Sequence, residues 1–182
     1  AEDYRFYWQD KWLTNPPPWL GPENPDWEGN YKVRFWNPEW QSIIFSYIDT
    51  IYSQGFDGIY LDIIDAYYYW SEENPEEPLA ASKMIQFVLN IQVHISELTN
   101  DDFFIIPQNG EFIIYDVSDD SLKMQYLDAI DGIGVEDVFL PGELDENNLF
   151  HPDTERLDVL QEFLNSGKNV FSVEYLTQSD LI

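Results

Sequence analysis

The chain has 182 residues, of which 44% are hydrophobic, and its 35 acidic and 8 basic residues give a formal net charge of -27. This composition predicts a folded domain with a core, and its acidity argues against nucleic acid and anionic membranes as partners. The absence of cysteine excludes disulfides, thiolate metal sites and a cysteine nucleophile.

The first 36 residues are rich in proline and tryptophan and show little hydrophobic periodicity, which predicts a long loop. Five of the seven tryptophans of the chain lie in this segment. Loops of this length usually serve a function, and tryptophan faces offer apolar platforms on which sugar rings stack. Tryptophans that only anchor a lid to the rest of the domain explain the composition equally well.

Helical and strand patterns alternate after residue 36. The stretch "WNPEWQSIIFSYIDTIYSQG" predicts a helix with Asn37 as N-cap, Pro38 at its first position and Gly55 as its stop. A strand is predicted at about 57–63, followed by a helix over about 78–99 that is opened by Pro78.

The second half of the chain continues this alternation. "FFIIPQNG" predicts a strand ending near Pro107, residues 118–129 a shorter helix, and "DGIGVEDVF" a third strand. "HPDTERLDVLQEFLNSGK" predicts a helix that ends at Gly167, before the strand "NVFSVEYL". Strands separated by helices need crossover connections and form a parallel sheet, so the predicted fold class is α/β.

Four such strands amount to about half of a (β/α)8 TIM barrel. An open doubly wound sheet explains the number of strands equally well, but its glycine-rich phosphate fingerprint is absent from the sequence. We therefore favour a partial barrel that forms a single domain over residues 1–182, with the loop of residues 1–36 at its rim.

Acidic and amide side chains stand at the end of every predicted strand. In chain order they are Asp62 and Asp65, Asn109 and Glu111, Glu136 and Asp137, and Glu174. In a barrel the carboxyl ends of the strands meet on one face, where active sites are built. We therefore expect these side chains to share one cleft.

This pattern fits reactions that use several carboxylates and few bases. No lysine or arginine lies at the end of a predicted strand, which disfavours a Schiff-base lysine and a phosphate cradle. Two chemistries remain: glycoside hydrolysis by a pair of carboxyl groups, and a divalent metal site held by acids at successive strand ends. The missing lysine base and the many aromatic residues favour the sugar reaction.

Six stretches carry a family resemblance, in this order along the chain: "AEDYR", "NPPPWLGPENPDWEGNYKVRFWNPEW", "GFDGIYLDIIDAY", "PQNGE", "GVEDVF" and "SVEYL". Together they span nearly the whole chain. They strongly resemble the motifs of the glycoside hydrolase 114-type TIM-barrel proteins, the endo-α-1,4-polygalactosaminidase family.

The resemblance implies a (β/α)8 barrel of which this chain supplies about strands four to seven with their helices. Asp62 would then close the fourth strand and Glu136 the sixth. In such enzymes an Asp after the fourth strand and a Glu after a later strand perform the chemistry. The resemblance thus implies Asp62 as nucleophile or electrostatic stabiliser and Glu136 as general acid/base, with the two roles open to exchange.

The resemblance also implies further substrate-binding side chains. Those that orient the sugar would be Asp65, Tyr67, Asn109, Glu174 and Tyr175, and those that line the rim would be Glu2 and Arg5. The family's substrates are amino-sugar polymers with free amines, and an acidic cleft would attract such a cationic chain.

Together these observations predict an endo-acting glycosidase that cleaves an amino-sugar-rich, polygalactosamine-like polysaccharide with two carboxylates, without a cofactor or a metal. A carbohydrate-binding barrel without turnover and a divalent-metal enzyme are the alternatives. The sequence has no apolar run of the length that inserts into a membrane and no visible signal peptide. We expect the protein to be extracellular or at the cell surface.

Overall fold

The structure is a computed structural model that describes residues 7–99, 102–144 and 146–177. The chain divides into two compact units, Ala1–Gly55 and Phe56–Ile182. Within the described ranges, no helix combines the length and the apolar character needed to cross a membrane.

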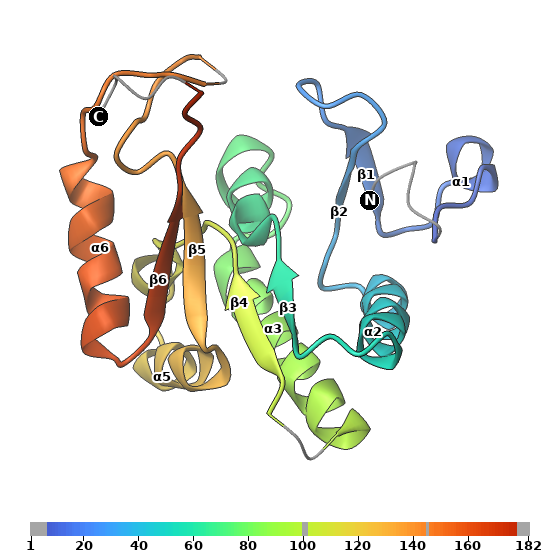
Figure 1. The fold of residues 1–182 in the computed structure, drawn as a ribbon. Helices are drawn as coiled ribbons and strands as arrows, with labels where there is room; N and C mark the ends of the chain where they lie inside the picture. Colours follow the sequence, from blue (N-terminus) through green and yellow to red (C-terminus); the bar gives the residue numbers. More distant parts are fainter. Residues whose placement is uncertain (1–6, 100–101, 145, 178–182) are drawn as a thin grey trace. The chain divides into compact units, whose positions relative to one another are not determined.

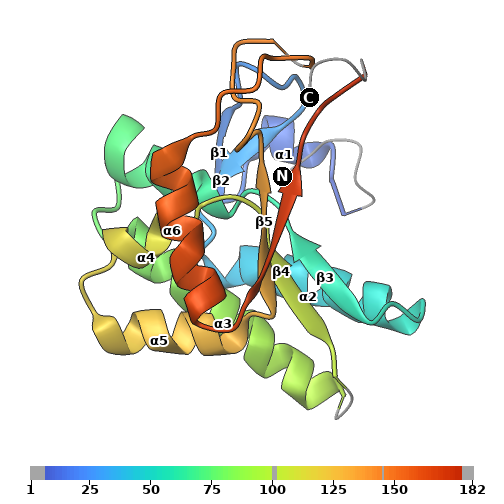
Figure 2. The same ribbon diagram turned by 60° about the vertical axis from the view of Figure 1, so that its left-hand side comes forward.

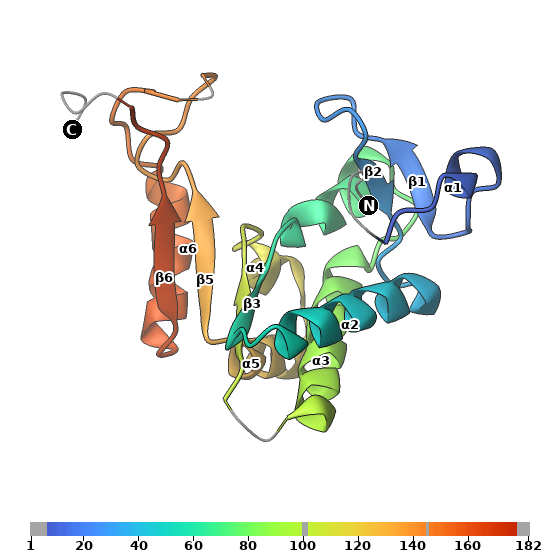
Figure 3. The ribbon, with the colours of Figure 1, turned by 45° about the vertical axis from the view of Figure 1, so that its right-hand side comes forward.

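The first unit contains regular structure where the sequence predicts only a loop. A helical turn, α1 (Lys11–Thr14), is followed by the strands β1 (Leu20–Glu23) and β2 (Tyr31–Val33) and then by the helix α2 (Pro38–Ser53). Figure 3 shows β1 and β2 side by side as an antiparallel pair. These strands are too short for a periodicity of two to stand out in the sequence.

Aromatic side chains form the core of this unit. Trp19 is 2% exposed, and its ring centroid lies 4.8 Å from that of Trp12 and 4.9 Å from that of Trp40 on α2. Trp27, in the turn between the two strands, is 67% exposed. The rings of Trp12, Trp19 and Trp40 therefore pack in the core of this unit, whereas the ring of Trp27 is exposed on its surface.

Helix α2 begins and ends close to the predicted positions. The Asn37 side chain accepts a hydrogen bond from the backbone N–H of Glu39 at 2.9 Å, and Pro38 is the first helical residue. This N-cap satisfies one of the backbone donors that a helix leaves unpaired at its start. The N-cap prediction is confirmed.

The second unit alternates strands and helices, as Figure 1 shows. Its strands are β3 (Gly58–Leu61), β4 (Phe104–Pro107), β5 (Gly132–Glu136) and β6 (Asn169–Val173). Its helices are the 3-10 turn η1 (Ile64–Ala66), the π-helical turn η2 (Tyr69–Glu73), α3 (Ala80–Leu98), α4 (Ile113–Asp116), α5 (Asp120–Ala129) and α6 (Thr154–Asn165). The four strands and the long helices agree with the sequence prediction, whereas η1, η2 and α4 are too short to have left a periodic signal.

The strands of this unit are parallel and lie in chain order. β3 pairs with β4, and β5 pairs with β6, each in regular parallel register. Between these pairs, Gln108 forms a parallel bridge with Gly134, and the backbone N–H of Asp131 donates to the carbonyl of Ile105 at 2.9 Å. The fold is therefore mixed α/β with small parallel sheets, and the described residues form no closed barrel.

The two faces of these strands differ in burial. Ile105, Ile133 and Val135 are 2% exposed or less and belong to the core that the helices cover. Figure 2 shows α6 running along β6 on this side. On the other face Tyr60 and Phe171 are each 47% exposed. Successive side chains of a strand point to opposite faces. Ile105 and Ile133 therefore face the helices, whereas Tyr60 and Phe171 lie on the open face.

Candidate active site

Unusual turns follow three of the parallel strands at their carboxyl ends. Ile63, Asn109 and Asp137 come one or two residues after the ends of β3, β4 and β5 and have φ angles of 64°, 59° and 53°. A β-branched residue such as Ile63 rarely adopts this left-handed conformation, which costs on the order of 1–2 kcal/mol. Such strain collects at functional sites, and here it sets the direction in which the chain leaves each strand.

The strand register places the two predicted catalytic carboxylates on the same face and at the same end. Tyr60 pairs with Ile106, and two residues further along β4, Gln108 pairs with Gly134. Glu136 lies two residues beyond Gly134, as Asp62 lies two beyond Tyr60, and side chains two apart on a strand share a face.

The charges around Tyr60 support this placement. Desolvation raises the pKa of the Tyr60 hydroxyl, and the negative charges of Glu136 and then Asp62 raise it further. Both carboxylates therefore act on one hydroxyl. Two acids that are far apart in the sequence therefore lie near Tyr60.

Glu136 is half-buried and held by several donors. The side-chain amide of Asn109 donates from Nδ2 to Glu136 Oε2 at 2.9 Å and accepts the backbone N–H of Glu136 at Oδ1 at 3.1 Å. The Tyr175 hydroxyl donates to the other carboxylate oxygen, Oε1. Residues from the ends of β4 and β6 thus fix the carboxylate at the end of β5.

These contacts decide the charge of Glu136. Desolvation raises its pKa, but the hydrogen bonds from Tyr175, Asn109 and Gln108 and the charge of Arg156 outweigh this, so the pKa is lowered. In return, the bond to Glu136 is the main cause that raises the pKa of Tyr175 to about 12. Glu136 is therefore ionised and Tyr175 protonated at neutral pH.

Arg156 joins helix α6 to this site. Its Nη1 donates to the backbone carbonyl of Glu136 at 2.8 Å, and its Nε donates to the Glu111 carboxylate. Glu111 is only 3% exposed, and an ion pair at such a position holds its partner in place because breaking it would leave a buried charge. The Glu111 carboxylate is therefore buried in an ion pair with Arg156 and is not exposed to a ligand.

The end of β3 carries Asp62 and Asp65. Asp62 is exposed, and its Oδ1 accepts the backbone N–H of Ile63 at 2.8 Å. Desolvation raises the pKa of Asp65, and the neighbouring charge of Asp62 raises it next. Gly110 lies against Asp65, because a Cβ at position 110 would come within 3.0 Å of the Asp65 backbone nitrogen. The loops after β3 and β4 therefore touch.

Two of the predicted sugar-orienting residues have structural contacts. Glu174 accepts the backbone N–H groups of Val138, Phe139 and Leu140 at 3.1 Å each, so its carboxylate ties down the loop after β5. Tyr67 is 1% exposed and donates to Asp116 at 2.7 Å. The contacts of both residues with a sugar stay predictions. The burial of Tyr67 favours a role in packing.

Asn109 and Tyr175 bond to Glu136, and Asp65 lies in the loop after β3 that also carries Asp62. The contact of these three residues with a sugar also stays a prediction. Glu2 and Arg5 lie outside the described residues. Among residues 7–99, 102–144 and 146–177, no three His, Asp or Glu side chains form a group that could hold a metal ion.

Sequence reasoning missed Tyr60 and Arg156, although each left a signal. Tyr60 stands two positions before Asp62, and the periodicity of a strand places both on the same face. Arg156 lies in the first turn of α6, where a positive charge opposes the helix dipole. A cation at that position indicates a specific partner nearby.

The chain is similar over almost its full length to curated proteins of three microorganisms. It is 46% identical over 177 residues to an uncharacterized protein of Methanocaldococcus jannaschii, covering 97% of this chain and 49% of that protein. It is 44% identical to one of Thermotoga maritima, with 97% and 52% covered, and 35% identical to one of Deinococcus radiodurans, with 100% and 55% covered. The chain thus spans about half the length of these relatives.

Two solved structures have a similar fold. The structure of Aspergillus fumigatus Ega3 in complex with galactosamine matches with a TM-score of 0.66 at 19% identity, over 96% of this chain and 56% of that one. The glycoside hydrolase domain of PelA from Pseudomonas aeruginosa matches with a TM-score of 0.59 at 14% identity, over 87% and 58%. The model of glycoside-hydrolase family GH114 matches residues 1–181, and the chain therefore belongs to that family.

Proposed function

We propose that the protein is a glycoside hydrolase that cleaves an amino-sugar polysaccharide with the carboxyl groups of Asp62 and Glu136. The observation that carries this proposal is that the strand register places Asp62 and Glu136 on the same face, at the carboxyl ends of β3 and β5. Glycosidases use two carboxyl groups placed on either side of one glycosidic bond. Membership of a glycoside-hydrolase family supports the same chemistry.

The charge state of Glu136 favours one distribution of roles. A carboxylate that accepts hydrogen bonds and has a lowered pKa is suited to act as nucleophile, base or electrostatic stabiliser. The proton for the leaving oxygen is then assigned to Asp62, at the end of β3. This exchanges the roles that the family resemblance first suggested.

The four parallel strands are proposed to be strands four to seven of a (β/α)8 barrel. Their order along the sheet follows the chain, helices cover one face, and aromatic side chains such as Tyr60 and Phe171 line the other. In a barrel the open face becomes the interior, and the strand ends with Asp62 and Glu136 become the floor of the active site.

An amino sugar is the substrate that the charge of the chain favours. The net charge is -27, and a cluster of carboxylates surrounds Tyr60, so a protonated amine gains electrostatic attraction there. The similar structure of Ega3 was solved with galactosamine. Because a polymer of this kind does not enter a cell intact, the enzyme is proposed to work outside the cell or at its surface.

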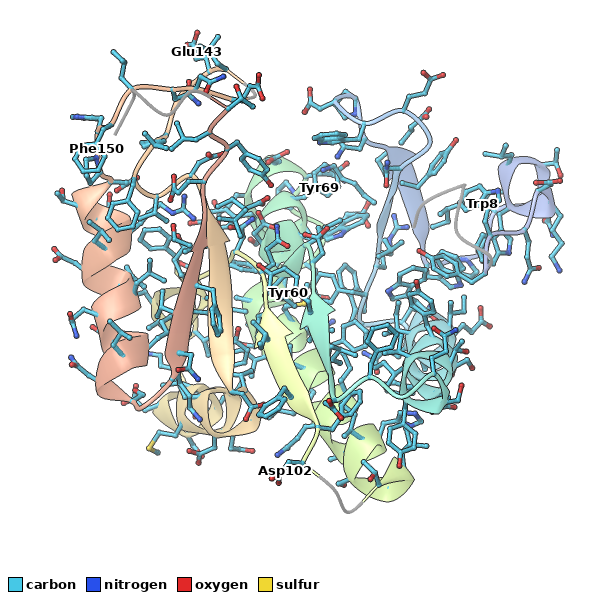
Figure 4. The ribbon with its side chains drawn as sticks, viewed as in Figure 1. Trp8, Tyr60, Tyr69, Asp102, Glu143 and Phe150 are labelled. Atoms are coloured by element: carbon cyan, nitrogen blue, oxygen red, sulfur yellow. The ribbon has the colours of Figure 1, made fainter. Side chains whose placement is uncertain are left out.

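Hydrolysis of a galactosamine polymer by the full-length protein tests this proposal. Asp62→Asn and Glu136→Gln should each lower the release of new reducing ends by about 10²–10⁴-fold while polymer binding remains. Asp57→Asn, at the opposite end of β3, is the matched control for Asp62 and should keep full activity. Glu143→Gln, an exposed acid in the loop after β5 (Figure 4), is the control for Glu136.

The same experiment separates the alternatives. Polymer binding without any release of reducing ends by the wild-type protein would favour a carbohydrate-binding barrel. Activity that survives both substitutions, or that a chelator abolishes, would favour the divalent-metal enzyme and contradict the proposal.

A further inference from the structure

Tyr60 lies on the open face of the strands, next to the end that carries the two carboxylates. Its side chain leaves β3, crosses β4 and ends over β5, because a Cβ built on Gly134 would lie 1.9 Å from the Tyr60 hydroxyl oxygen. The residue is 47% exposed, and Figure 4 shows it near the arrowheads of β3 and β4. The hydroxyl thus lies over β5, near the end of the strands that carries the carboxylates.

Gly134 makes this arrangement possible. The built Cβ would also come within 2.6 Å of the carbon that bears the hydroxyl and 2.8 Å of a neighbouring ring carbon. Any side chain at position 134 would therefore push the ring away from β5. Gly134 therefore allows the Tyr60 ring to lie directly over the backbone of β5.

The hydrogen-bonding capacity of the site also points to Tyr60. The hydroxyl of Tyr175 and the amide of Asn109 already donate to Glu136, whose ionised carboxylate accepts but does not donate. A sugar hydroxyl placed between Asp62 and Glu136 needs a donor as well as acceptors. Tyr60 carries a neutral hydroxyl, which can do both.

We propose that the Tyr60 hydroxyl hydrogen-bonds the sugar unit held between Asp62 and Glu136, and that Gly134 is the residue that gives its ring room. This inference rests on the proposed function, since it names a binding residue of the same site. It adds Tyr60 to the side chains that the sequence predicts to bind the sugar.

Tyr60→Phe in the full-length protein tests the inference, because it removes only the hydroxyl. We expect the Kd for a galactosamine oligosaccharide, measured by calorimetry in the non-hydrolysing Glu136→Gln background, to rise about three- to tenfold, as for one lost hydrogen bond. In the otherwise wild-type protein, kcat/KM should fall by a similar factor. Tyr115→Phe, at a tyrosine that is 51% exposed and bonded to Glu162, is the control and should change neither value.

The pH profile distinguishes substrate binding from an indirect effect on Glu136. If Tyr60 only tuned that carboxylate, Tyr60→Phe would shift the acid limb of kcat/KM. A substrate contact lowers kcat/KM at every pH and leaves the limb where it is. An unchanged Kd and kcat/KM, or a shifted limb without a change in Kd, would overturn the inference.

Gly134→Ala provides a second test that does not depend on the stability of one variant. It should weaken binding when Tyr60 is present and have no further effect in a Tyr60→Ala background, because the displaced ring is then absent. Additive losses would contradict the pairing.

If the wild-type protein binds the oligosaccharide but does not hydrolyse it, the proposed function fails while the role of Tyr60 is still decided by the Kd values. A wild-type protein that does not bind contradicts both.

Discussion

Glu136 shows how single contacts set the chemistry of a residue. The groups that lower its pKa come from three places in the chain, namely the amides of Gln108 and Asn109 at the end of β4, the Tyr175 hydroxyl after β6 and the charge of Arg156 on α6. Each of them stabilises the charged carboxylate over the protonated one, which is why the pKa falls although desolvation alone would raise it. The charge of Glu136 is therefore a property of its surroundings rather than of its place in the sequence.

Tyr175→Phe should shift the pH dependence of hydrolysis. The substitution removes a donor to the charged form, so the pKa of Glu136 rises toward its ordinary value. Since activity requires the ionised carboxylate and is lost as pH falls through this pKa, the acid limb of kcat/KM should move to higher pH. The profile of kcat/KM against pH measures this. A limb that stays in place, or moves to lower pH, would contradict the assigned charge.

Helix α6 is the element that links the fold to the site. Asp153 caps it by accepting the backbone N–H groups of Glu155 and Arg156 at 3.1 Å each. The cap therefore holds the same turn from which Arg156 reaches Glu111 and Glu136. A local capping interaction, common in any helix, here supports the position of a proposed catalytic group.

Asp153→Ala should lower both stability and activity. Loss of such a cap costs about 1 kcal/mol of unfolding free energy, and the freed first turn loosens Arg156. Asp119 caps α5 in the same way through Ser121 and Leu122, so Asp119→Ala is the matched control. It should cost similar stability in urea unfolding but leave kcat/KM unchanged. Equal losses of activity in both variants would show that the effect is general.

The positions of the elements follow from local sequence, whereas the partners of the site residues do not. Asn37 and Gly55 bracket α2 by chemistry that any isolated helix would share. The alternation of strands and helices likewise placed the acids of β3 and β5 at one edge. By contrast, whether Glu174 faces a ligand or accepts three backbone N–H groups depends on a loop that only the folded chain brings to it.

The charge of the whole molecule affects encounters with the substrate. A net charge of -27 gives the surface a field that attracts a polycation and repels anionic polymers. Salt screens such a field, with a Debye length of about 10 Å at 0.1 M ionic strength. The acidity of the chain is therefore expected to act on affinity and association rate rather than on the chemical step.

Binding of a galactosamine polymer should weaken as salt concentration rises. The amines of this polymer are protonated at neutral pH, whereas the N-acetylated polymer is neutral and provides the matched control. Titration calorimetry or surface binding at increasing sodium chloride concentrations measures the difference. A galactosamine Kd that does not depend on salt, or an equal dependence for both polymers, would argue against electrostatic selection of the amino sugar.

The proposed hydrolysis requires that Asp62 and Glu136 act on the same sugar linkage. A crystal structure of the full-length Glu136→Gln variant with a galactosamine oligosaccharide tests it most directly. We predict one glycosidic bond flanked by the side chains at positions 62 and 136, with the Tyr60 hydroxyl in contact with the sugar. An oligosaccharide bound elsewhere, with these two positions on no common sugar unit, would contradict the account.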